Sequence, residues 1–302
     1  MKILVLDVGG SSIKYAVMNQ EAEFFDKGKI PTPLDKIENF VDSIGAIYDK
    51  YRDIISGIAI SMPGRIDSDR GYAYTGGSLQ YNGGKNIVEI LQERCPLPIF
   101  IENDGKCAAL AEACAGNLSD SNDGIVVIIG TGIGGGIIKD KKLHKGANFI
   151  AGEFSFVKTI SGSISNTLTS IWGLTCGVGT LIREVADKKG LSKDEVDGIK
   201  VFEYVNNGDE EVLKLLDDYT YRIAEQLFNL QYMYDPEKIA IGGGISAQEI
   251  LLEYIQKNIK KIDEELPYDF PCPTVVRCKF MNDSNLIGAL HVYLKKMENI
   301  NA

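Results

Sequence analysis

Three clusters of glycine follow directly after short apolar runs, and they are the first candidates for a chemical role. The clusters are Asp7-Val8-Gly9-Gly10-Ser11-Ser12, Gly130-Thr131-Gly132-Ile133-Gly134-Gly135-Gly136 and Gly242-Gly243-Gly244. Glycine lets a phosphate group come close to clustered backbone N–H groups, which bind its oxygens. Hydroxyls at positions 11, 12 and 131 and the ammonium of Lys14 would add donors. A single cluster is equally well a tight turn, but three of them after apolar strands favour a nucleotide site.

Two widespread phosphate motifs do not fit this sequence. No G-x-x-x-x-G-K-[ST] pattern occurs, so no P-loop is predicted. The spacing Gly130-x-Gly132-x-x-Gly135 matches the dinucleotide fingerprint in form, but that fingerprint must open a helix. Residues 137–142 predict a strand and a charged hairpin instead, which disfavours a Rossmann site.

Two carboxylates stand at the ends of predicted strands, and each has two interpretations. Asp7 follows the apolar run 3–6, where it would hold Mg²⁺, directly or through water, or be satisfied by turn amides. Asp104 follows the run 99–101 and precedes a helix, where it would accept a proton from a substrate hydroxyl or serve as an N-cap. The residue types alone do not decide between these alternatives.

The elements that must position these residues alternate between strands and helices. Strands are predicted at 3–6, 15–18, 58–60, 99–101, 125–129, 137–138 and 239–241, and helices at 37–51, 86–94, 108–115, 209–234 and 285–296. This alternation predicts an α/β layer fold. The polar segment 119–124 ends in glycine and is the predicted domain boundary. Both halves begin with a strand, a glycine cluster and another strand, which hints at duplication.

Composition disfavours several classes of protein. The chain has 302 residues, 44% of them apolar, and a formal net charge of −10, which disfavours binding to nucleic acid. It shows no signal-peptide pattern and no apolar run of spanning length, so we expect a cytoplasmic protein with no membrane partner. Six cysteines without a C-x-x-C pair predict reduced thiols, and two histidines are too few for a His-rich metal site.

In their order along the chain, these motifs resemble those of the ROK family of sugar kinases and repressors. The first glycine cluster with Lys14 is similar to that family's first phosphate motif, and residues 129–136 to its second. Glu102-Asn103-Asp104 resembles its catalytic segment. Ala151-Gly152-Glu153 is similar to its sugar-binding segment, and residues 241–244 to its adenosine-side turn. The resemblance extends over nearly the whole chain.

The resemblance implies a two-domain, actin-like (ribonuclease H-like) α/β fold with ATP and a sugar in an interdomain cleft. The N-terminal domain would comprise residues 1–118, completed by the C-terminal helix 285–302, and the C-terminal domain residues 119–284. Asp7 would hold Mg²⁺, and homodimers are the family habit. The implied residues are the catalytic base Asp104; sugar-binding Ser61, Gly64, Asn82, Asn103, Asp104 and Glu153; and nucleotide-binding Asp7, Gly9, Gly10, Ser11, Ser12, Lys14, Gly130, Thr131, Gly132, Gly134, Gly243 and Gly244.

Two departures from the family pattern bear on metal and substrate. Members often carry a zinc-binding His three residues after the sugar-binding Glu, and a C-x-C-G-x-x-G-C segment downstream. Here the first position is Phe156, and residues 172–179 contain one cysteine, Cys176. A structural zinc site needs about four N or S ligands, so no zinc is predicted. Residues 151–156 resemble the zinc-free branch that includes β-glucoside kinases, in which Phe156 would stack on a second sugar ring or fill the core.

We therefore expect an ATP-dependent sugar kinase that phosphorylates the 6-hydroxyl of a hexose or β-glucoside. An N-acetylmannosamine kinase or a glucokinase is the alternative within the enzymes. A non-catalytic sugar-sensing protein, or a ROK-type transcriptional regulator lacking its DNA-binding domain, is the alternative from another class. The first phosphate motif starts at residue 7, so we expect no helix-turn-helix before it.

Overall fold

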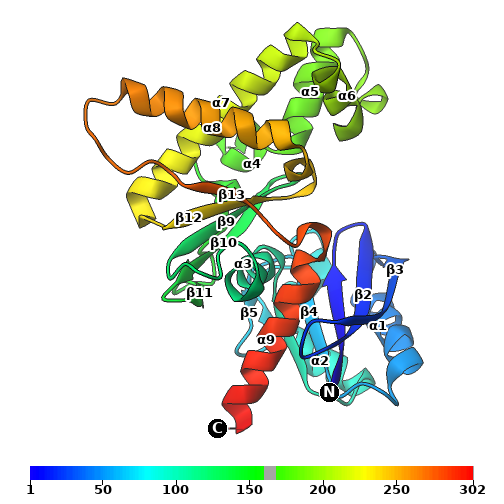
Figure 1. The fold of residues 1–302 in the computed structure, drawn as a ribbon. Helices are drawn as coiled ribbons and strands as arrows, with labels where there is room; N and C mark the ends of the chain where they lie inside the picture. Colours follow the sequence, from blue (N-terminus) through cyan, green and yellow to red (C-terminus); the bar gives the residue numbers. More distant parts are fainter. Residues whose placement is uncertain (160–167, 302) are drawn as a thin grey trace. The chain divides into compact units, whose positions relative to one another are not determined.

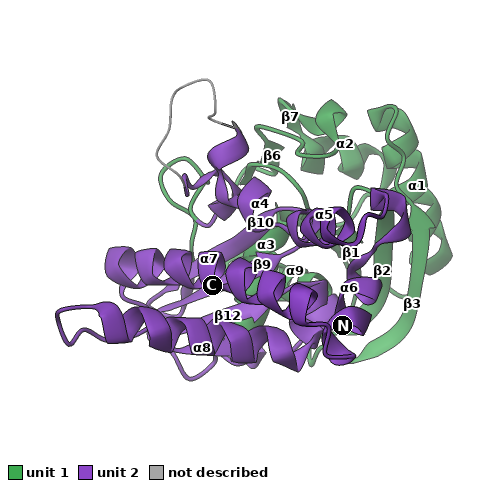
Figure 2. Ribbon diagram, turned by 90° about the horizontal axis from the view of Figure 1, so that it is seen from above, with its two compact units in different colours: residues 1–114, 143–151, 283–302 green, residues 115–142, 152–282 purple. Residues whose placement is uncertain are grey.

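The computed structural model describes residues 1–159 and 168–301. This part of the chain forms two compact α/β units, each built on one five-stranded sheet (Figure 1, Figure 2). The first unit comprises residues 1–114, 143–151 and 283–302, and the second comprises 115–142 and 152–282. The predicted α/β class is confirmed. The segment 143–151 belongs to the first unit, although the sequence placed it within the C-terminal domain.

The sheet of the first unit has the strand order β3-β2-β1-β4-β8. Its strands are β1 (Lys2–Val8), β2 (Ser12–Asn19), β3 (Phe24–Pro31), β4 (Ile58–Met62) and β8 (Ile99–Asn103). Its helices are α1 (Ile37–Tyr51), α2 (Ile87–Arg94), α3 (Asp104–Ala115) and α9 (Ser284–Asn301). β1, β4 and β8 run parallel, whereas β1, β2 and β3 form antiparallel pairs. The stretch between β4 and α2 also contains the short strands β5 (Ile66–Asp67), β6 (Tyr72–Ala73) and β7 (Lys85–Asn86). β6 pairs with both β5 and β7.

Alternate residues of β1 point to opposite faces of this sheet, as the pleat requires. Leu4 and Leu6 belong to the core cluster that includes Phe40 of α1. Helix α9 packs against β1, β4 and β8, and its buried Tyr293 meets Phe100 of β8 edge-on, with ring centroids 5.3 Å apart. The odd-numbered residues of β1 therefore face α9.

The sheet of the second unit repeats this arrangement with the order β11-β10-β9-β12-β13. Its strands are β9 (Gly124–Ile129), β10 (Ile133–Lys139), β11 (Lys142–His144), β12 (Lys238–Gly242) and β13 (Val275–Arg277). Its helices are α4 (Trp172–Thr175), α5 (Val178–Lys189), α6 (Gly198–Asn206), α7 (Glu210–Tyr234) and α8 (Glu249–Glu265). β9 pairs antiparallel with β10 and parallel with β12, as β1 does with β2 and β4. The matching order supports the hint of duplication.

The long helix α7 shows why the sequence predicted these elements well. The Asp209 side chain accepts a hydrogen bond from the Val212 N–H at an N···O distance of 3.2 Å, which caps the helix start. Leu216 and Ile223 of its apolar stripe are fully buried in the core. α7 and α8 lie side by side over the sheet (Figure 1). None of the helices in the described ranges combines the length and apolar character that crossing a membrane requires.

Candidate functional site

The first predicted phosphate turn joins β1 to β2 in the first unit. The Gly9 N–H donates to the Ser12 carbonyl at an N···O distance of 3.0 Å, which closes the turn. The Thr32 hydroxyl donates to the Gly9 carbonyl at an O···O distance of 2.7 Å. Gly10 and Ser11 at the tip are exposed, as a turn that receives a phosphate group must be.

The Asp7 carboxylate lies near the end of β1 and is 8% exposed. Its Oδ1 accepts hydrogen bonds from Asn285 Nδ2 at 2.9 Å and from Ser61 Oγ at 3.4 Å. Its Oδ2 lies 3.7 Å from Lys14 Nζ. Carboxylate oxygens are the ligands that Mg²⁺ prefers, and Mg²⁺ usually keeps several waters. Asp7 therefore fits a magnesium ion held through water. Its hydrogen bond with Asn285 was not predicted from the sequence.

Polar side chains form one row across the parallel strands of the first unit. Asp7 of β1 pairs in register with Ser61 of β4, which pairs with Glu102 of β8. Ser61 is fully buried and Glu102 is 1% exposed. The structure thus places the Ser61 hydroxyl as a partner of the Asp7 carboxylate, and its predicted contact with a sugar stays a prediction.

The predicted catalytic segment lies where β8 ends and α3 begins. Asn103 caps the helix, because its Oδ1 accepts the Lys106 N–H at 3.1 Å, while its Nδ2 donates to the Gly64 carbonyl at 3.0 Å. Asp104 is the first residue of α3, and its Oδ1 accepts the Gly105 N–H at 2.8 Å. The alternative in which Asp104 is the N-cap is therefore wrong. A carboxylate in the first turn is stabilised by the helix dipole.

Gly64 and Asn82 lie in the irregular stretch that follows β4. Gly64 has a φ of +114°, and an added Cβ would lie 2.1 Å from the Thr75 carbonyl oxygen, so this position requires glycine. The Asn82 side chain is fully buried, and among the described residues neither its Nδ2 nor its Oδ1 finds a hydrogen-bond partner. An unsatisfied buried polar group costs about 1–3 kcal/mol, so this amide suits a ligand hydroxyl or a water.

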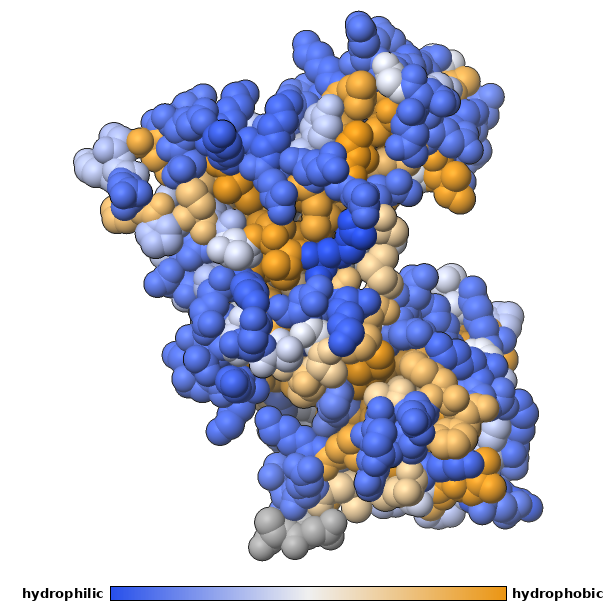
Figure 3. Space-filling view, in the orientation of Figure 1, coloured by the Kyte–Doolittle hydropathy of each residue, from blue (hydrophilic) through white to orange (hydrophobic). Residues whose placement is uncertain are grey.

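A pocket of about 560 Å³ in the second unit joins two of the predicted nucleotide motifs. Gly130 and Thr131 of the second phosphate turn line it together with Gly244 of the predicted adenosine-side turn. Apolar surface is visible in the region of α5 and α6, which supply much of its wall (Figure 3). The full lining is Ile129, Gly130, Thr131, Val178, Gly179, Ile182, Gly198, Ile199, Phe202, Gly244, Ile245 and Gln248. A polar turn beside apolar walls is typical of a nucleotide site.

The glycines at this pocket fall into two classes. Gly243 has a φ of +96°, and an added Cβ would lie 2.1 Å from the Ile129 carbonyl oxygen, so the turn cannot form without it. At Gly179, Gly198 and Gly244 an added Cβ would meet nothing within 4 Å. These three glycines are not required by packing, and they leave space that a ligand can occupy.

Gly132 and Gly134 do not line this pocket. A Cβ on Gly132 would lie 2.7 Å from Ser155 Oγ, and the same Oγ accepts the Ile133 N–H at 2.9 Å. Gly134 lies on β10 with an exposed surface, where a Cβ would have room. The structure therefore gives Gly132 a role in shaping the turn.

The apolar wall of the pocket was not predicted from the sequence. Ile182 comes from α5, and Ile199 and Phe202 come from α6. On the sequence these residues belong to ordinary apolar stripes, which are more often core than ligand contact. Ile199 is 72% exposed, an unusual state for a large aliphatic side chain, but this signal exists only in the structure.

Glu153 and Phe156 lie at a short 3-10 helix, Phe154–Phe156, of the second unit. The preceding Gly152 has a φ of +86° and no room for a Cβ against the backbone of β10. Phe154 is buried, whereas Phe156 is 69% exposed. The alternative in which Phe156 fills the core is therefore wrong, and its ring is open to a ligand.

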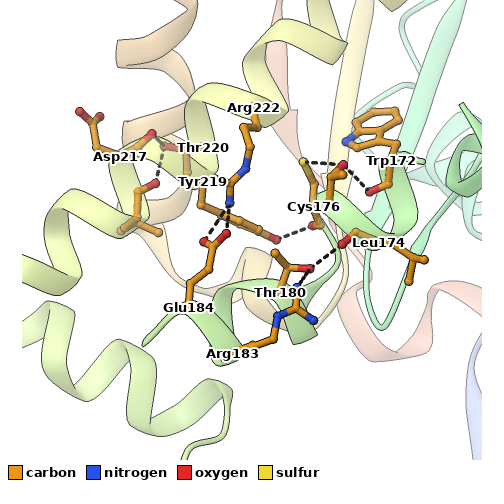
Figure 4. A network of polar contacts seen from close by, with 12 residues as sticks. Trp172, Leu174, Cys176, Thr180, Arg183, Glu184, Asp217, Tyr219, Thr220 and Arg222 are labelled. Atoms are coloured by element: carbon orange, nitrogen blue, oxygen red, sulfur yellow. Dashed lines mark hydrogen bonds and ion pairs between the residues drawn. The ribbon is translucent and has the colours of Figure 1, made fainter. Parts of the chain in front are cut away.

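The segment in which family members carry clustered cysteines belongs to a polar network of the second unit (Figure 4). The Tyr219 hydroxyl donates to the Cys176 carbonyl at 2.6 Å, and Arg222 Nη2 lies 2.9 Å from both carboxylate oxygens of Glu184. Burial raises the pKa of the Cys176 thiol, whereas zinc binds the thiolate. Within residues 1–159 and 168–301, no group of three or more His, Cys, Asp or Glu side chains could hold a metal ion. This donor set does not fit structural zinc.

Known proteins resemble this chain over nearly its whole length. The ROK family model matches residues 3–296. An uncharacterised protein of Clostridium perfringens is 32% identical, and a β-glucoside kinase of Listeria monocytogenes is 27% identical; each comparison covers 98% of both chains. The crystal structure of a ROK family protein from Streptococcus pneumoniae in complex with sucrose gives a TM-score of 0.88 at 28% identity, covering 99% of this chain and 100% of that chain. These matches confirm the predicted two-domain actin-like fold, and the chain belongs to the ROK family.

Proposed function

We propose that this protein is an ATP-dependent sugar kinase and that its substrate is a β-glucoside, phosphorylated at the 6-hydroxyl. The observation that carries the proposal is the pocket in which Gly130, Thr131 and Gly244 share one lining with apolar helix residues. Such a pocket suits a polyphosphate at its glycine end and an adenine ring at its apolar wall. The Listeria relative named a β-glucoside kinase supports transfer to a sugar of that class.

In the proposed reaction, Asp104 accepts a hydrogen bond from the sugar hydroxyl and aligns its oxygen with the γ-phosphorus. The O–P ester bond forms, the bond from the γ-phosphorus to the bridging oxygen breaks, and ADP leaves while the hydroxyl proton passes to Asp104. Backbone N–H groups of the turns at 9–12 and 130–132 stabilise the charge on the phosphate oxygens. Mg²⁺ held near Asp7 through water would neutralise part of that charge.

The sugar would be recognised by polar groups of the predicted catalytic segment, of the irregular stretch after β4 and of the predicted sugar-binding segment. In the first unit, the unpartnered amide of Asn82 supports a hydrogen bond to a sugar hydroxyl. Asn103 is fixed by its two hydrogen bonds to the backbone, which pre-organises it and the neighbouring base. We also assign Glu153 to sugar hydroxyls, as the family resemblance implies.

The β-glucoside assignment depends on Phe156. Its ring is 69% exposed, three residues after Glu153. Aromatic faces stack on sugar rings and on aryl groups with little demand on hydrogen bonding. An aglycone or second glucose unit would give this ring a partner that a free hexose lacks.

Three further expectations belong to this proposal. The functional domains are residues 1–118 with 285–302, and residues 119–284. The protein forms a homodimer. It holds no zinc, which the poor donor set at Cys176 supports.

Replacing the base tests the kinase proposal directly. Asp104→Asn keeps the shape of the side chain but cannot take the proton, so kcat should fall by about 10²- to 10⁴-fold. Binding of the sugar, measured by calorimetry, should change little. The exposed Asp53→Asn is the matched control and should keep full activity. Near-normal turnover of Asp104→Asn would show that the base is elsewhere.

Filling the pocket tests the nucleotide site. Gly179→Leu places a side chain in open space on α5, where leucine is also the better helix former by about 0.8 kcal/mol. We expect the KM for ATP to rise about tenfold or more while thermal stability is kept. Gly179→Ala should give a smaller rise. An unchanged KM for ATP in the leucine variant would place the nucleotide outside this pocket.

Removing the exposed ring tests the substrate class. Phe156→Ala should lower kcat/KM for cellobiose and aryl-β-glucosides by about tenfold, the value of one aromatic contact, and leave kcat/KM for glucose unchanged. Leu174→Ala, another exposed apolar side chain of the second unit, is the control. Equal losses on glucose and on the glucosides would contradict stacking on an aglycone.

Metal analysis tests the zinc-free assignment. The purified protein should contain far less than one equivalent of zinc, because no group of three or more candidate metal ligands includes Cys176 in the described part of the chain. Incubation with a chelator should leave the melting temperature unchanged. One tightly held equivalent of zinc, or a chelator-induced loss of stability, would refute it.

A further inference from the structure

The proposed chemistry leaves one buried ion pair of the first unit without a role. Glu102 is 1% exposed, and its Oε2 lies 3.7 Å from Lys145 Nζ. Its Oε1 accepts the Asn103 N–H at 2.8 Å. A carboxylate at this depth strongly disfavours folding unless a cation and hydrogen bonds compensate it. The pair therefore constrains the residue directly before Asn103 and Asp104.

Lys145 is itself fixed at several points. Its Nζ lies 2.5 Å from Ser68 Oγ and 3.6 Å from Asp69 Oδ1. Its carbonyl accepts the Ala151 N–H at 3.2 Å, which closes the loop 145–151. That loop runs directly into Gly152 and Glu153, the predicted sugar-binding segment. One lysine thus joins the strand before the base to the loop before the sugar-binding glutamate.

A cavity of about 160 Å³, lined by first-unit residues, lies beside this pair. Glu102 and Lys145 line it together with Asp69, Lys295 and Lys296. Lys296 pairs with Asp69. Lys296 shares Asp69 with Lys145, but its ion pair with Asp69 does not involve Glu102. Lys296 therefore offers a matched control for the loss of one cavity-lining lysine without loss of the Glu102 pair.

We propose that Lys145 is a positioning residue for phosphoryl transfer to the sugar. Its ion pair with Glu102 holds the segment 102–104 in place, and its backbone bond to Ala151 holds the loop 145–151. The two sugar-side segments keep their geometry through this one residue. This inference rests on the proposed sugar kinase function.

Kinetics test the positioning role. Lys145→Met should lower kcat/KM for the sugar by at least about tenfold, the effect of a small misplacement of reacting groups, and leave the KM for ATP near its normal value. Lys145→Arg keeps the charge and should recover most of the activity. Lys296→Met should keep the kinetic constants of the wild-type protein. The proposal would be overturned if Lys145→Met left the sugar kinetics unaltered or if Lys145→Arg recovered no activity. It would also be overturned if Lys296→Met lost as much activity as Lys145→Met.

Thermal unfolding tests the ion pair independently of catalysis. Lys145→Met should lower the melting temperature by roughly 5 °C or more, because it leaves a buried carboxylate unpaired. The double variant Glu102→Gln with Lys145→Met should recover part of that loss, because no unpaired charge remains. Strictly additive losses would overturn the coupling. If the wild-type protein phosphorylates no sugar, the proposed function is wrong. The unfolding measurements would still test the ion pair between Glu102 and Lys145.

Discussion

The first unit buries carboxylates at the ends of its parallel strands, and its structure depends on giving each of them a partner. Asp7, Ser61 and Glu102 lie in one row, and each is at least nine-tenths buried. Buried charges need partners, and these come from distant parts of the chain: Asn285 for Asp7 and Lys145 for Glu102. The row is satisfied only when three separate stretches of chain have assembled. The site is therefore built by the tertiary fold as much as by its own motifs.

In the second unit, the site depends on backbone sterics at its glycines. Gly152 and Gly243 have positive φ and no space for a Cβ, so the chain cannot turn there with another residue. Gly179 and Gly244 have open space and no such need. The first kind makes the turns, and the second kind leaves the pocket empty. In the sequence all of these residues are simply glycine. Only the structure distinguishes the glycines that the backbone conformation requires from those that leave space for a ligand.

Local patterns explain which features the sequence could predict. α7 was predicted to within one residue, because its apolar period and its cap are local signals. The start of α3 was placed at residue 108 instead of Asp104, because Gly105 and its polar neighbours weaken the helical pattern. β3 was not predicted, since its mixed polar sequence gives little alternation. Partners such as Asn285 lie 278 positions from the residue they contact, and no local pattern encodes such a pairing.

The two proposed sugar contacts differ in kind, and this difference bears on selectivity. The buried amide of Asn82 carries a desolvation cost that a well-placed hydroxyl removes and that an analogue lacking this hydroxyl leaves in place. Sites that depend on such bonds reject the wrong ligand strongly. The exposed ring of Phe156 gains mainly from contact area, which many groups can supply. A kinase that combines them would be strict about the ring it phosphorylates and tolerant of the group attached to it.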